Sequence, residues 1–118
     1  MNRAERVAGE LHALIAEMIQ REIKDPRVGE ISITQVTVSG DLGVATLRFL
    51  PLGGIGDAVA AQKGLTKASG YLRRLLRKRM RIRNIPALRF VIDDHHEEAV
   101  SLIEQLNALA ESALAREE

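Results

Sequence analysis

The spacing between apolar residues changes along the chain, and these changes restrict the fold more than any other feature. Over residues 3–24 apolar side chains recur every three or four positions, which is typical of an amphipathic helix. Asn2 and Glu5 match a capping box at its start. Asp25-Pro26 ends the helix, because a residue before proline avoids helical backbone angles.

Two strands are expected next. Over 31–38 and 45–49 apolar residues alternate with polar ones, as in strands that bury one face. The alternation slips by one residue near Thr34-Gln35, which is typical of a β-bulge. The connection through Ser39-Gly40-Asp41 is so short that the two strands must be antiparallel.

The next part of the chain returns to a helical pattern. Residues 55–68 indicate a helix of modest strength, weakened by Gly64. The pattern breaks at Ala68-Ser69-Gly70 and resumes as a second helix, which ends at Asn84-Ile85-Pro86. The apolar stripe of this second helix is formed by Leu72, Leu75, Leu76 and Met80.

A third strand and a last helix complete the pattern. Alternation over 88–92 predicts the strand. Asp93 or Asp94 can cap the last helix, whose buried stripe is Val100, Ile103, Leu106 and Leu109. The order helix, strand, strand, helix, helix, strand, helix predicts an α+β fold, in which helices cover one face of a three-stranded sheet.

Length and composition are those of one domain. The chain has 118 residues, no cysteine and 3% aromatic residues, so the core must be aliphatic and no disulfide or cysteine metal site can form. We expect one domain over 1–118, with its core over about 3–107 and the end of the last helix and a tail over 108–118. No export signal or membrane-spanning run is present, which favours a cytoplasmic protein with no membrane partner.

Charge is segregated along the sequence. Residues 58–92 contain ten lysines and arginines and no acidic residue, whereas residues 93–118 contain eight acidic residues and only Arg116 as a base. Opposite charges at i,i+4 spacing, the usual sign of internal neutralisation, are absent from the basic block. Seven of the ten bases are arginine, whose planar fork binds phosphate oxygens in pairs.

The basic block therefore predicts a polyanionic partner, and structured RNA is favoured over a membrane surface. If five or six of these residues contact phosphates, affinity should fall by roughly two to three decades over a fourfold increase in salt. An alternative is a protein adaptor whose basic helix docks on an acidic partner. The candidate RNA-binding residues are Lys63, Lys67, Arg73, Arg74, Arg77, Lys78, Arg81 and Arg83.

Three segments resemble one bacterial family. They are Ile23-Lys24-Asp25-Pro26-Arg27 at the end of the first helix, Val36–Leu42 at the hairpin, and Leu76–Asp93. Their order and spacing are similar to those of ribosome-binding factor A, and the order of elements is that of the type II KH fold. The resemblance implies binding to the free 30S small ribosomal subunit and its precursors, and a role in late assembly and maturation of 16S rRNA, without a known catalytic site.

The junction at Ala68-Ser69-Gly70 supports this resemblance over a generic KH-like RNA-binding protein. Ordinary KH domains carry a Gly-x-x-Gly loop between two helices. Here Gly53-Gly54-Ile55-Gly56 matches that string but precedes the first of the two helices, where it makes a flexible turn. The family resembles this chain in having an Ala-x-Gly kink at the junction, which implies a role for Ala68 and Gly70, with Ser69 at the variable position. Glycine backbone freedom is the expected reason for Gly70.

Catalysis is not expected, nor is a cofactor, a metal or a small-molecule substrate. His95-His96-Glu97-Glu98 contains ligand types, but adjacent residues on a helix rarely converge on one ion and no second cluster completes the set. His12 lies beside the apolar stripe of the first helix and is expected to be a boundary residue. A monomer is expected, because the basic block would repel itself at a two-fold interface.

Overall fold

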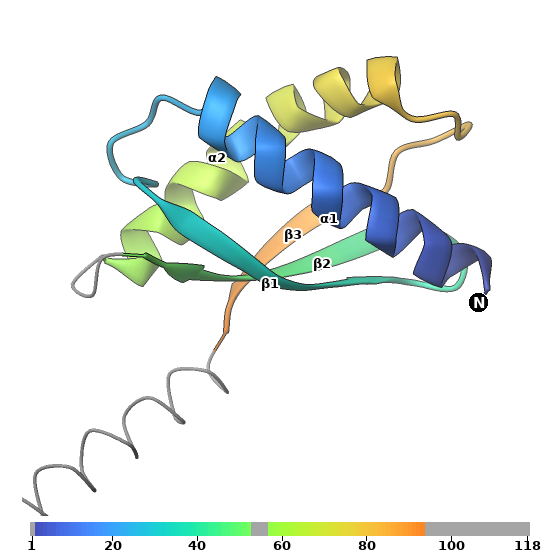
Figure 1. The fold of residues 1–118 in the computed structure, drawn as a ribbon, viewed down its shortest axis with the longest axis horizontal. Helices are drawn as coiled ribbons and strands as arrows, with labels where there is room; N and C mark the ends of the chain where they lie inside the picture. Colours follow the sequence, from blue (N-terminus) through green and yellow to red (C-terminus); the bar gives the residue numbers. More distant parts are fainter. Residues whose placement is uncertain (1, 53–56, 94–118) are drawn as a thin grey trace, which may run out of the picture.

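The computed structural model describes residues 2–52 and 57–93. Their elements are α1 (Arg3–Glu22), β1 (Ile31–Val38), β2 (Val44–Pro51), α2 (Ala58–Arg79) and β3 (Ala87–Ile92). The sheet has the order β1-β2-β3, with β2 antiparallel to β1 and parallel to β3. Both helices lie on the same face of the sheet (Figure 1). The predicted α+β architecture is confirmed, whereas the last predicted helix lies outside the described residues.

The first helix begins as the sequence predicts. The Asn2 side chain accepts a hydrogen bond from the Glu5 backbone N–H (2.8 Å), and the Asn2 amide donates to the Glu5 carboxylate (3.3 Å). The helix ends at Glu22, where Ile23 becomes extended, two residues earlier than the periodicity indicates. Its buried residues are Val7, Ala8, Leu11, Ile15, Met18 and Ile19.

The β1–β2 hairpin contains the predicted irregularity. Ile33 pairs with Phe49 and Gln35 pairs with Arg48, so Thr34 is the extra residue. Its hydroxyl donates to the Asp93 carboxylate (2.6 Å), and His12 Nε2 on α1 donates to the neighbouring Ile33 carbonyl oxygen (2.9 Å). Hydrogen bonds to α1 and to the residue after β3 therefore stabilise the bulge. His12 has a structural role at the edge of the core.

The number of helices in the middle of the chain is a correction to the sequence prediction. Two helices separated at Ala68-Ser69-Gly70 were expected, but a single 22-residue helix runs from Ala58 to Arg79. The helix begins at Ala58, after Asp57, whose carboxylate accepts from the Ala60 N–H (3.1 Å). One glycine costs a helix only about 1 kcal/mol, which the buried stripes on either side outweigh.

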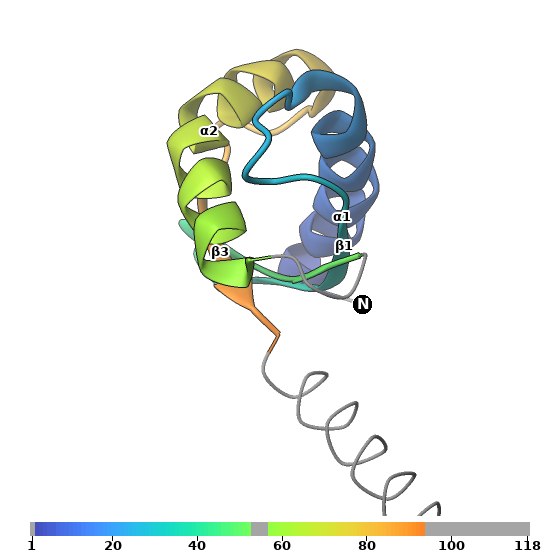
Figure 2. The ribbon, with the colours of Figure 1, turned by 90° about the vertical axis from the view of Figure 1, so that its left-hand side faces the viewer.

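A bend is nevertheless visible in α2. Its first part, green in Figure 2, runs up one side of the molecule, and its second part, yellow, turns across the top. Ser69 Oγ donates to the Thr66 carbonyl oxygen (2.7 Å), a local bond that often accompanies helix bending. Gly70 is helical and has no positive φ, so the expectation that it needs special backbone angles was wrong.

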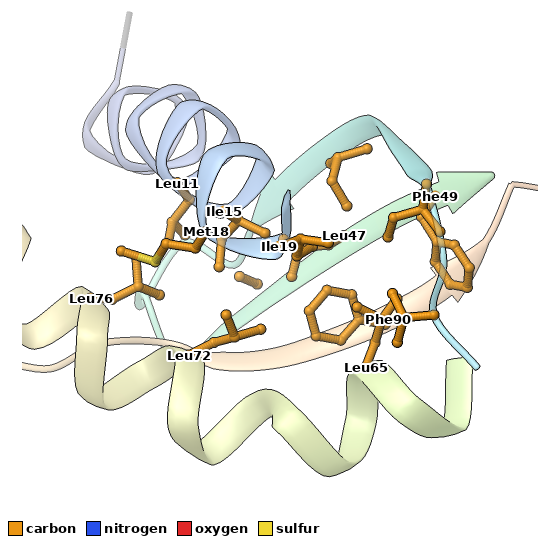
Figure 3. Close-up of a cluster of buried hydrophobic side chains, with 14 of the residues drawn as sticks. Leu11, Ile15, Met18, Ile19, Leu47, Phe49, Leu65, Leu72, Leu76 and Phe90 are labelled. Carbon is orange, nitrogen blue, oxygen red and sulfur yellow. The ribbon is translucent and has the colours of Figure 1, made fainter. Parts of the chain in front are cut away.

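The core is aliphatic, as predicted, with two phenylalanines. Leu47 and Phe49 of β2 face the helices, and Phe90 of β3 packs beside Leu65 of α2 (Figure 3). Leu11, Ile15, Leu47, Phe49, Leu65, Leu72 and Leu76 have no exposed surface. The side of α2 that carries Leu65, Leu72 and Leu76 is thus fixed against the sheet and α1.

Gly64 holds the loop between α1 and β1 against α2. A Cβ atom at Gly64 would lie 2.8 Å from Val28 Cγ2 and 3.2 Å from Asp25 Oδ2. Contacts this short require a backbone without a side chain, so Gly64 allows close packing here in addition to lowering helix propensity. Because Gly64 has no side chain, the Asp25–Val28 loop can pack directly against the helix backbone.

The two glycines of α2 should respond oppositely to alanine. Gly64→Ala should lower the free energy of unfolding by roughly 1–3 kcal/mol, because the added methyl overlaps Val28. Gly70→Ala, where a Cβ meets nothing within 4 Å, should raise it by up to about 1 kcal/mol through helix propensity. Urea denaturation followed by circular dichroism measures both. Shifts of the same sign would contradict this account of Gly64.

Candidate nucleic-acid interface

The exposed side of α2 carries a row of cations. Lys63, Lys67, Arg74, Arg77 and Lys78 are all exposed, and their spacing of three, four or seven residues places them along one side of the helix. We call these five residues the α2 basic face. The buried stripe of Leu65, Leu72 and Leu76 lies on the opposite side, so core burial orients the basic face toward solvent.

No residue of this face forms an ion pair within the described part of the chain. Within 2–52 and 57–93, ion pairs join only Arg21 to Glu17 (3.1 Å) and Arg27 to Asp25 (2.6 Å). Neither pair includes a residue of α2. Arg77, Lys78 and Arg79 also lie in the last turn of the helix, where the negative end of the macrodipole stabilises cations. The α2 basic face therefore presents its charge outward at little cost to the helix.

Gly70 lies in the middle of this face. It is exposed, and a Cβ built on it meets no atom within 4 Å. The helix backbone is consequently bare between Lys67 and Arg74. The remaining predicted kink residues, Ala68 and Ser69, are half-buried and belong to the same turn.

Arg73 differs from the other candidate residues. It is half-buried, and its Nη2 donates to the Ile85 carbonyl oxygen (2.8 Å) in the segment before β3. Its Nε is buried without a hydrogen-bond partner. The guanidinium of Arg73 thus connects the second half of α2 to the segment before β3. Counting charges in the sequence does not reveal that this side chain points inward.

Tyr71 is a surface residue that the sequence pattern does not single out. Its hydroxyl donates to Glu22 at the end of α1 (3.2 Å), which raises the pKa of Tyr71. The Arg74 guanidinium lies 5.8 Å from the centre of its ring, within the range of a cation–π contact. The residue places one aromatic ring, 39% exposed, beside the α2 basic face.

Asp25 contributes an acidic group near Lys67. Arg27 donates to it from its side chain and from its backbone N–H, and these bonds, with a smaller attraction from Lys67, lower the pKa of Asp25 from 3.8 to about 2. Asp25 therefore stays ionised and bound to Arg27 throughout the neutral range. Its charge pairs with Arg27 and so stabilises the loop that contacts Gly64.

The last two candidate arginines lie beyond the helix. Arg81 and Arg83 are exposed in the loop after α2, which lies at the same end of the molecule as the start of α1 (Figure 1). Arg81 lines a groove of about 380 Å³ together with Arg3, Arg6 and Glu10 of α1. Arg83 lines an adjoining hollow that also includes Arg3. Arg3 and Arg6 were missed because nothing in the sequence pairs positions 3–6 with 81–83.

The described residues give no sign of a metal site or a membrane span. No three histidines, aspartates or glutamates among them group as metal ligands, and none of their helices is long and apolar enough to cross a membrane. The His95-His96-Glu97-Glu98 cluster lies outside the described residues.

The elements and the charge define an α+β domain of KH-like type with a basic helix face turned to solvent. A family model described as ribosome-binding factor A matches residues 3–106. A ribosome-binding factor A from Thiobacillus denitrificans is 40% identical over 115 residues, covering 98% of this chain and 90% of the relative. The chain belongs to the ribosome-binding factor A family, which confirms the resemblance seen in the sequence.

Solved structures agree with this assignment. The crystal structure of ribosome-binding factor A from Thermus thermophilus has a TM-score of 0.68 at 26% identity, covering 75% of this chain and 93% of that one. A homology model of the Thermus factor, fitted into an electron cryo-microscopy map of a 30S complex, has a TM-score of 0.61 at 27% identity, covering 73% and 90%.

Arg73 and Arg74 should differ in their contribution to stability. Arg73→Met leaves the Ile85 carbonyl without its donor and should lower the free energy of unfolding by roughly 1–3 kcal/mol. Arg74→Met, at an exposed position, should change it by about 0.5 kcal/mol or less. Urea denaturation gives the comparison. Equal losses in the two variants would contradict the structural role of Arg73.

The Asp25–Arg27 pair should make stability depend on acid. The folded-state pKa of Asp25 is about 2, below its ordinary 3.8, so its contribution is complete above pH 3.8 and is lost as pH falls through about 2. Asp25→Asn should therefore be less stable than the parent at pH 7, and the difference should shrink below pH 3.8. Denaturation midpoints across this range test it. A difference that stays constant down to pH 2 would refute the ionic contribution.

Proposed function

We propose that this chain binds the free 30S ribosomal subunit and its precursors by contacting 16S rRNA, and that it acts in late subunit assembly and 16S rRNA maturation. The proposal extends to this chain the 30S complex of its Thermus relative. The observation that carries it is the α2 basic face, which is exposed and has no carboxylate partner among the described residues. The protein acts there as a cytoplasmic, non-catalytic monomer, in one domain over 1–118.

RNA backbone is the partner whose chemistry fits the face best. Lys67, Arg74 and Arg77 offer charge at intervals of three to seven residues along one helix, which suits a row of phosphates. The bare backbone at Gly70 leaves room for close approach in the centre of the row. Tyr71 adds one ring on which an unpaired base can stack, although most of the surface is aliphatic or charged.

Charge reversal on the α2 basic face tests the proposal. Arg74→Glu, Arg77→Glu and Lys78→Glu together should weaken binding to free 30S subunits by at least about a hundredfold at moderate salt, because phosphate attraction becomes repulsion. Sedimentation with 30S, 50S and 70S particles measures selectivity, and titration with labelled protein measures affinity. Arg77 and Lys78 also interact with the helix macrodipole, so the corresponding glutamine triple variant checks for loss of folding.

The matched control keeps the net charge change and moves it elsewhere. Arg21→Glu, Lys24→Glu and Arg89→Glu alter three exposed cations outside α2 and should change affinity by only a few fold. If both triple variants lose binding equally, net charge and not the α2 basic face is responsible.

Competition distinguishes RNA from an acidic protein partner. Protein-free 16S rRNA should displace labelled protein from 30S subunits, whereas polyglutamate of matched charge should not. Displacement by polyglutamate alone would favour the adaptor alternative, in which the basic helix docks on an acidic protein.

A further inference from the structure

The groove between the start of α1 and the loop after α2 is a separate feature from the α2 basic face. Arg3, Arg6 and Arg81 line it, with Glu10 as its acidic member and Val7 and Ile82 as its apolar members. Its volume is about 380 Å³, ample for a phosphate group with part of the attached sugar. Arg3 and Ile82 continue into the adjoining hollow that contains Arg83. The fold thus gathers four arginines from two distant parts of the sequence.

These arginines make no side-chain hydrogen bond or ion pair within the described residues. No carboxylate of the described residues lies within ion-pair distance of Arg3, Arg6, Arg81 or Arg83, since the ion pairs found there involve other cations. None of the four donates a side-chain hydrogen bond within that part of the chain. All four are exposed. Their charges are available to a ligand.

The position of Arg3 and Arg6 at the start of α1 is a second indication that the cluster binds an anion. They occupy the first and fourth residues of α1, where the positive end of the helix macrodipole disfavours cations. Arg81 and Arg83 approach the same place from the loop after α2. A bound anion would relieve this repulsion and would also be attracted by the helix terminus itself.

The acidic groups near the groove do not supply that anion. The Asp41 carboxylate accepts from the Ser39 hydroxyl (2.7 Å) and the Gly43 N–H (2.9 Å), bonds that lower its pKa and engage it in the β1–β2 turn. Glu10 lines the groove but pairs with none of its arginines. One carboxylate against three arginines leaves the groove cationic.

We propose that this groove binds a backbone phosphate of the same RNA that the α2 basic face binds. The inference rests on the proposed function and adds a second contact site beyond the C-terminal end of α2. Arginine forks bind phosphate oxygens in pairs, and the apolar walls at Val7 and Ile82 reduce competition from water. Contact at both places would fix the orientation of the protein on the RNA, which one row of charges cannot do.

Neutralising the groove tests the inference. Arg3→Gln with Arg6→Gln should weaken binding to free 30S subunits by about tenfold at about 0.1 M salt, and should lower the slope of log affinity against log salt by about 1 for each phosphate that is no longer bound. The control, Arg21→Gln with Arg89→Gln, removes the same charge from exposed sites outside the groove and should change both quantities little.

Two further readouts separate phosphate binding from a folding defect. Removing cations from the start of α1 should leave the Arg3→Gln, Arg6→Gln protein as stable as the parent or more stable, by thermal denaturation. Glu10→Gln should increase affinity by a few fold, since it removes the carboxylate that faces the bound phosphate. Glu30→Gln, at an exposed site directly before β1 and outside the groove, is its control.

The outcomes distinguish this inference from the proposed function. If the α2 triple variant loses binding while the groove variants behave like their controls, the groove inference is overturned and the proposed function stands. If the parent protein does not bind 30S subunits, the proposed function fails first. Weaker binding with an unchanged salt slope, and no gain in Glu10→Gln, would indicate an interaction other than phosphate binding and would also overturn the inference.

Discussion

The burial of one side of α2 determines most of what the molecule presents to a partner. Leu65, Leu72 and Leu76 have no exposed surface, and they pack on the sheet and on α1 on the face that both helices cover. A helix fixed in this way has only one side left for charged residues. The α2 basic face is therefore a consequence of core packing, and its position relative to the sheet is as rigid as the core.

A close contact in the first half of the same helix completes this arrangement. Gly64 admits the Asp25–Val28 loop, and the Asp25–Arg27 pair holds that loop in shape. The loop connects α1 to β1, so its contact with α2 helps to position the two helices relative to each other on the sheet. The motif at the end of α1, which carries part of the family resemblance, has in this way a physical role in the fold.

Patterns that depend on neighbouring residues were predictable from the sequence, and contacts between distant residues were not. Periodicity and caps indicated the strands, the bulge at Thr34 and the start of α1. The prediction of a helix break at Ala68-Ser69-Gly70 was wrong. Local helix propensity is low there, but the aligned buried leucines on both sides keep the helix continuous. The hydrogen bond from Arg73, one of the predicted binding residues, to the Ile85 carbonyl depends on tertiary packing and could not be predicted. The proximity of Arg3 and Arg6 to Arg81 in one groove could not be predicted from the sequence either.

The two sets of cations differ in how much their positions say about function. Arg77 and Lys78 lie at the end of α2, where a helix favours positive charge, so their presence there has a structural explanation as well as a functional one. Arg3 and Arg6 lie at the start of α1, where a helix disfavours positive charge, and they have no ion-pair partner among the described residues to compensate. A placement that the helix macrodipole disfavours, and that no ion pair of the described residues compensates, is better accounted for by a ligand. The smaller cluster is therefore the more specific indicator of an anion, even though the larger one supplies more of the charge.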